Sequence, residues 1–111
     1  MMLRNLTAAA AFLATASVAQ TPTSVERATS DLDSCMRANA SLDLARAKGA
    51  PTAAKAALGK CGPEDGKLDR AVARASKAAG KTATHNRAAT KDARKAVLSA
   101  VEAFIAANTA Q

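Results

Sequence analysis

Apolar residues recur at the spacing of an α-helix along most of this chain. From about Ser24 to Lys48 they return three, four or seven positions apart, which places them on one stripe of a long helix. The members of this stripe are Val25, Ala28, Leu32, Cys35, Met36, Leu42 and Ala45. Gly49 and Pro51 favour the end of this helix and the start of another. The pattern therefore predicts an αα-hairpin whose second arm runs from about residue 52 to residue 60.

Two further helices are predicted after this hairpin. Gly62-Pro63 interrupts the chain, and the acidic residues Glu64 and Asp65 suit the first turn of a third helix. Its expected core stripe is Leu68, Ala71, Val72, Ala75 and Ala79. A break at 80–84 precedes a last helix, which is apolar only near its end, at Val97, Leu98, Val101, Phe104 and Ile105. Residues 73–96 contain no Leu, Ile, Val, Met or Phe, so we expect them to be largely solvated or frayed.

The first nineteen residues have the pattern of a secretory signal peptide. A basic residue, Arg4, precedes an apolar run from about residue 6 to residue 16, and Ser17-Val18-Ala19 provides a small-x-small cleavage site. The apolar run is too short for a membrane span, which needs about 20 residues. Gln20 stands where a lipoprotein would need a cysteine. We therefore expect cleavage after Ala19 and a periplasmic or secreted protein without a transmembrane anchor, in which residues 20–111 form a single small helical domain.

The expected hydrophobic core of this domain is small. Leu, Ile, Val and Phe make up less than the roughly 20% of residues below which a composition resembles that of disordered chains, although alanine is abundant. An exported chain can use a disulfide to compensate, and Cys35 and Cys61 are its only cysteines. Closing this loop of about 27 residues would stabilise the fold by on the order of 3.5 kcal/mol. The predicted fold class is all-α: a small disulfide-stapled helical hairpin plus two further helices, resembling a four-helix bundle.

Positive charge is concentrated in one segment of the chain. Residues 20–66 carry six basic and six acidic side chains, whereas residues 67–95 carry nine basic side chains against Asp69 and Asp92. The candidate anion-binding residues are these nine: Lys67, Arg70, Arg74, Lys77, Lys81, Arg87, Lys91, Arg94 and Lys95. The first five step by three or four positions, which would place them on one face of the third helix. The other four continue the pattern on the last helix.

A basic helical face of this kind favours phosphate-bearing partners, because a polyanion releases counterions when it binds. Export points to an anionic lipid or polymer of the cell envelope. Nucleic acid is disfavoured, because Phe104 is the only aromatic residue after the signal peptide and no stacking platform is available. The alternative is that the basic face only keeps an alanine-rich helix soluble.

The chain offers little material for catalysis. His85 is its only histidine and is expected on the solvated surface. The neighbouring carboxylates Asp31 with Asp33, and Glu64 with Asp65, are not predicted to converge on one substrate. The sequence contains no nucleotide-binding, nucleophile-elbow, metalloprotease or haem-attachment motif. We predict no enzyme, no catalytic residues, no cofactor, no metal site and no small-molecule substrate.

In length, signal peptide and cysteine number, this layout resembles the acid-stress periplasmic chaperones of the HdeA type, which are also short, helical, basic and held by one disulfide. The resemblance implies an alternative function, in which the protein would bind unfolding clients at acid pH. The primary prediction is a small exported non-enzymatic protein that binds anionic components of the cell envelope through a basic helical face.

Overall fold

The computed structural model describes residues 23–110, and no strand occurs among them. Five helices make up this part of the chain: α2 (Ser24–Ala38), α3 (Leu42–Lys48), α4 (Ala50–Gly59), α5 (Gly62–Ala78) and α6 (Ala83–Thr109). The all-α fold class is confirmed. The predicted signal peptide and its cleavage site lie outside the described residues.

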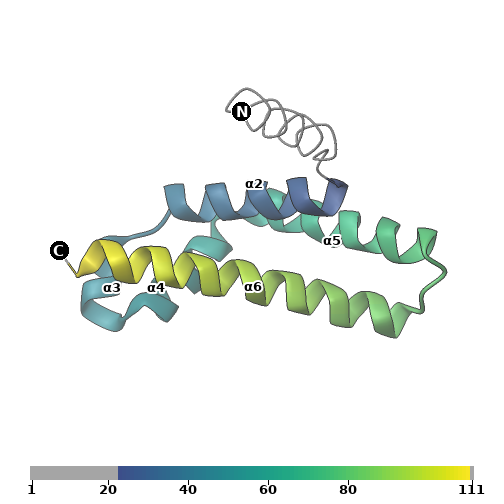
Figure 1. The fold of residues 1–111 in the computed structure, drawn as a ribbon. Coiled ribbons are helices and arrows are strands. Elements are labelled where there is room, and N and C mark those ends of the chain that lie inside the picture. Colours follow the sequence, from purple (N-terminus) through teal and green to yellow (C-terminus); the bar gives the residue numbers. More distant parts are fainter. Residues whose placement is uncertain (1–22, 111) are drawn as a thin grey trace, which may run out of the picture.

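The two long C-terminal helices and α2 form the elongated body of the molecule (Figure 1). Helix α2 packs against both α5 and α6, and it runs antiparallel to α5. The short helices α3 and α4 form a hairpin that packs against the C-terminal half of α6. The other end of α6 and the end of α5 meet at a turn that is remote from this hairpin.

The predicted first helix is divided in two, so its expected continuation to Lys48 is wrong. The helix α2 stops at Ala38, and the side-chain amide of Asn39 donates to the backbone oxygen of Cys35 at 2.9 Å. The hydroxyl of Ser41 accepts from the backbone N–H of Leu44 at 3.1 Å and caps α3. Asn and Ser side chains compete for backbone hydrogen bonds in this way, so the chain turns although its apolar spacing continues.

The other helix ends follow from local sequence. Thr23 and Glu26 form a reciprocal capping box at the start of α2, and their hydrogen bonds lower the pKa of the Glu26 carboxyl. Gly49 joins α3 to α4 at φ 96°, and Gly80 follows α5 at φ 69°, both in the region that favours glycine. At the end of α5, the Lys81 N–H donates to the Ser76 oxygen and closes a Schellman motif.

The core is small and rich in alanine. Its largest fully buried side chains are Leu32, Met36, Leu68, Ile105, Val101 and Cys61. Helix α4 contributes three buried alanines, Ala53, Ala54 and Ala57, which lets its backbone approach α6 closely. The predicted core positions Ala75 and Ala79 are wrong, because both are exposed and α5 buries Ser76 instead. Apart from the turn around Gly80, residues 73–96 are helical, and Ser76 is the buried residue among them.

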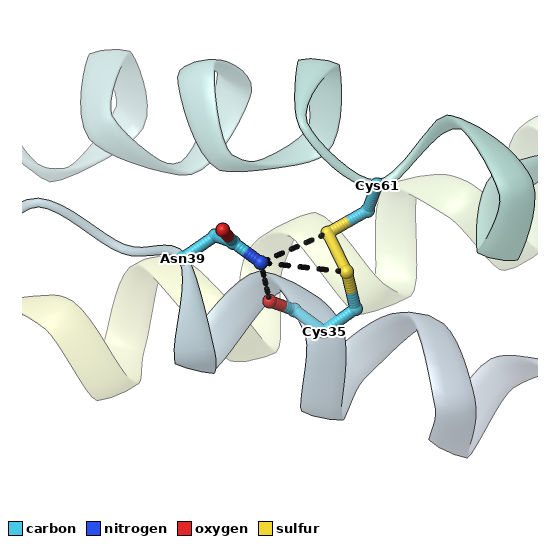
Figure 2. Close-up of a disulfide and its surroundings, with 3 residues drawn as sticks. All are labelled: Cys35, Asn39 and Cys61. Atoms are coloured by element: carbon cyan, nitrogen blue, oxygen red, sulfur yellow. Dashed lines mark hydrogen bonds between the residues drawn. A yellow bond between two sulfur atoms is a disulfide. The ribbon is translucent and has the colours of Figure 1, made fainter.

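The predicted disulfide is present and joins Cys35 to Cys61, with 6.1 Å between their Cα atoms. Cys35 lies in the last turn of α2, and the fully buried Cys61 is the N-cap of α5. The amide nitrogen of Asn39 lies 3.6 Å and 3.8 Å from the two sulfur atoms (Figure 2). The bridge therefore fixes the C-terminal end of α2 against the beginning of α5.

Candidate anion-binding surface

The basic side chains predicted for the third helix lie on the exposed surface of α5. Lys67, Arg70, Arg74 and Lys77 are all solvent-exposed on this helix. Lys81 is exposed too, but it follows the end of α5, so its predicted position on the helical face is wrong. The reason is Gly80, which ends the helix before the pattern of basic residues is complete.

Three of these cations line an open groove of about 380 Å³ between α2 and α5. Each helix contributes four positions with the spacing i, i+3, i+4 and i+7, which is one face of a helix. The lining residues are Ser24, Arg27, Ala28 and Asp31 from α2, and Lys67, Arg70, Ala71 and Arg74 from α5. The groove therefore joins Arg27, which precedes the predicted basic segment, to Lys67, Arg70 and Arg74.

None of the four cations of this groove lies within 4 Å of a carboxylate of residues 23–110. Within residues 23–110, the arginines that lie within 4 Å of a carboxylate are Arg37, Arg46 and Arg94. Four cations and the single carboxylate of Asp31 give the groove a formal net charge of 4 − 1 = +3. Uncompensated guanidinium and ammonium groups that face one space attract anions more strongly than isolated surface charges do.

Gly66 leaves room for one of these arginines. A side chain carbon added at this glycine would lie 3.3 Å from the Nη1 atom of Arg70. The Arg70 side chain therefore lies back along α5, over the preceding turn, as long helical side chains commonly do. This orientation places its guanidinium close to Gly66, on the N-terminal side of Arg70 along α5.

Arg94 has a different environment from the other predicted anion-binding residues. Its Nε donates to Asp65 at 2.8 Å and its Nη2 donates to Asp69, so it connects α6 to α5. The hydrogen bond that Arg94 donates to Asp65 is the main cause that raises the pKa of Arg94. With two carboxylates bound and 28% of its side chain exposed, Arg94 adds little free positive charge to the surface.

We expect Arg94→Gln to lower the free energy of unfolding by roughly 1 kcal/mol, since it removes two charge-assisted hydrogen bonds from a partly exposed site. Urea unfolding at pH 7 measures this loss. Arg87→Gln is the matched control, because Arg87 lies on the same helix and has no carboxylate within 4 Å among the residues that the structure describes; it should change stability by less than about 0.5 kcal/mol. Equal effects of both substitutions would show that the bridge contributes nothing.

The remaining predicted cations lie on α6. Arg87 and Lys91 line a second groove of about 340 Å³ together with Arg94, Asp69, Asn86 and Thr90. The Oδ1 atom of Asn86 is buried there and has no hydrogen-bond partner among residues 23–110. Lys95 is exposed on α6. The carboxylate of Asp69 and the bound state of Arg94 make this groove less positive than the one between α2 and α5.

The residues considered for catalysis or metal binding do not form a common site among residues 23–110. His85 is exposed near the start of α6. Asp33 pairs with Arg37, while Asp65 pairs with Arg94. Cys35, Cys61 and Glu64 bring potential ligand atoms within 4.8 Å of one another, but the two sulfur atoms are joined and offer no thiolate.

None of the described helices combines the length and the apolar character that crossing a membrane requires. Comparisons with protein-family models, with curated proteins and with solved structures gave no match for this chain.

Proposed function

We propose that this protein is an exported, non-enzymatic protein that binds anionic components of the cell envelope through the basic surface of α5. The observation that supports this proposal best is the row of exposed cations on α5, which continues beyond the helix end at Lys81 and has no ion-pair partner within the described part of the chain. Such a row recognises negative surfaces through many screened Coulomb interactions and needs no enclosed pocket.

The proposed location rests on two features of the chain. The Cys35–Cys61 disulfide is typical of proteins that fold in an oxidising compartment. The first nineteen residues have the charge, apolar run and small-residue ending of a signal peptide. An envelope of a bacterial type offers phosphate-bearing lipids and polymers to a protein of this charge, and cytoplasmic nucleic acid is not available there.

Vesicle flotation tests the proposal directly. We expect the protein to float with phosphatidylcholine vesicles that contain about 30 mol% phosphatidylglycerol at about 20 mM salt, and to dissociate at about 300 mM salt, where the Debye length is much shorter. Pure phosphatidylcholine vesicles should not bind it. Absence of binding at low salt would overturn the proposal.

Matched variants separate the α5 surface from net charge. Replacing Lys67, Lys77 and Lys81 with glutamine should weaken vesicle binding by on the order of 100-fold, at about 1 kcal/mol per lysine near an anionic surface. The control replaces Lys48, Lys55 and Lys60, three exposed lysines outside the α5 surface, and removes the same charge. If the control loses as much affinity as the first variant, the binding is a property of net charge and the proposal for α5 is wrong.

A mostly apolar groove supports chaperone-like client binding as a second candidate. It lies between α2 and α6, measures about 480 Å³, and is lined in part by Val25, Val97, Ala96 and Ala100. A chaperone function predicts that the disulfide form suppresses client aggregation at acid pH, and that the lysine variants above suppress it equally well. Suppression that depends on those lysines would instead favour binding through the α5 surface.

A further inference from the structure

We propose that the groove between α2 and α5 is a binding site for a phosphomonoester group, which Arg27, Arg70 and Arg74 hold from two sides. This inference rests on the proposed function, and it narrows a general preference for anions to one chemical group at one site. The proposed site also includes Arg27 of α2, whereas the basic surface described under the proposed function lies on α5.

The charges converge because the two helices are antiparallel and tethered. Arg27 faces the groove from α2, while Lys67, Arg70 and Arg74 face it from α5. The disulfide and the packing of α2 on α5 hold these faces together before any ligand arrives. A preformed arrangement of this kind lowers the entropy that a ligand must lose on binding, so it favours a defined complex over loose association.

The residue types favour a phosphate. Three of the four cations are arginines, whose planar guanidinium offers paired N–H donors that match two oxygens of a phosphate. A phosphomonoester carries about −1.5 to −2 charges near pH 7 and presents three strongly accepting oxygens. A phosphodiester or a carboxylate carries one charge and fewer free oxygens, so it would satisfy fewer of the donors that line this groove.

The N-terminal end of α2 adds to this preference. Ser24, in the first turn of the 15-residue helix α2, lines the groove with its neighbour on the same face, Arg27. The first turn of a helix carries partial positive charge from its free N–H groups. The Glu26 carboxylate in the same turn offsets part of this charge, so the backbone dipoles add only a small preference for an anion at this end of the groove.

Two features of the groove indicate what the ligand contains besides its phosphate group. The volume of about 380 Å³ is larger than a phosphate group alone needs, and the small side chains of Ala28 and Ala71 leave it open. Asp31 faces the same space and repels anions, which favours a ligand with a concentrated charge at one end and a neutral remainder. A phosphate ester of a small polyol or sugar, free or as a lipid headgroup, has this character.

Nuclear magnetic resonance titration of the intact oxidised protein tests the site. We expect glycerol 3-phosphate to cause saturable shifts of backbone amides in residues 24–31 and 67–74, and to leave those around Lys91 and Lys95 nearly unchanged. Sodium chloride at equal ionic strength is the control for general screening and should not cause saturable shifts of these amides. Shifts that spread evenly over all basic residues, or that never saturate, would overturn the proposal.

Substitutions on α2 make the test specific, because a surface built from α5 alone does not involve that helix. Arg27→Gln should weaken glycerol 3-phosphate binding at least about tenfold, the usual scale for a lost charge-assisted contact. Lys55→Gln removes the same charge from an exposed position of α4 and should change the affinity by less than about twofold. Asp31→Asn should strengthen binding several-fold. Equal effects of Arg27→Gln and Lys55→Gln would contradict the site.

Vesicles distinguish a headgroup from a soluble ester, and they separate this inference from the proposed function. Phosphatidic acid presents a phosphomonoester, whereas phosphatidylglycerol at equal surface charge presents a phosphodiester. The groove is supported as a headgroup site if flotation is stronger with phosphatidic acid than with phosphatidylglycerol and if Arg27→Gln abolishes this difference. Saturable glycerol 3-phosphate binding without any flotation supports a soluble ligand and overturns only the envelope proposal. Flotation that is the same for both headgroups and is unchanged by Arg27→Gln overturns only the proposal of a site in the groove.

Discussion

Removal of the Cys35–Cys61 bridge is expected to lower the free energy of unfolding by about 3.5 kcal/mol. The two cysteines are 26 positions apart, so the bridge closes a loop that contains all of α3 and α4. Without it, the unfolded chain gains the conformational entropy that the closed loop excludes. A small domain with a stability of about 5 to 10 kcal/mol would lose a large fraction of it.

Urea unfolding of the oxidised protein and of the double variant Cys35→Ala with Cys61→Ala measures this loss. Cys61 is fully buried, so alanine is preferable to serine, which would bury a hydroxyl group. Reductant should destabilise the wild type by a similar amount and leave the double variant unchanged. A loss smaller than about 1 kcal/mol would mean that the unfolded loop is already restricted or that the bridge is strained.

The sequence predicted the helices well where a stop signal and the apolar spacing agree. Gly49 and Gly62-Pro63 mark real boundaries, and the stripe containing Leu68 and Val72 is buried as expected. The division between α2 and α3 was missed because the apolar spacing continues through it. Only the side chains of Asn39 and Ser41, which form hydrogen bonds to the backbone, reveal that the chain turns there.

The candidate site was only partly predictable. The basic face of α5 follows from spacing alone, but Arg27 lies 40 positions before Lys67, in a segment whose charges cancel. The predicted Cys35–Cys61 disulfide would have indicated that Arg27 lies near the basic face of α5. Arg27 lies eight positions before Cys35 and Arg70 lies nine after Cys61, so an antiparallel α2 and α5 bring them to similar heights, about 12 to 14 Å from the bridge.

The partners of Arg94 illustrate what spacing cannot supply. Its contacts with Asp65 and Asp69 depend on how α6 is rotated against α5, since the residues are 29 and 25 positions apart. Rotation about the helix axis is set by the packing of Val97 and Val101 into the core. Periodicity identifies the buried stripe of one helix, but it leaves open which residue of a neighbouring helix lies opposite.

A second large effect is expected from Leu32→Ala, which should lower the free energy of unfolding by about 3 kcal/mol or more. Leu32 is among the largest fully buried side chains of α2, and this helix packs against α4, α5 and α6. Large apolar side chains are few in this core, and its many alanines have short side chains that cannot move to fill the space. The cavity should therefore persist, and persistent cavities increase the cost of such a truncation.

Leu58→Ala is the matched control, because it makes the same chemical change at a partly buried position of α4. It should cost about 1 to 2 kcal/mol, since part of the removed surface already faces water. Thermal unfolding should show the difference as a much lower midpoint for Leu32→Ala, at about 4 to 8 °C per kcal/mol for a domain of this size. If the two variants lose equal stability, the core does not centre on the contact of α2 with α5 and α6. The bridge would then hold together two helices that contribute little packing energy of their own, and the groove between them would depend on the disulfide alone.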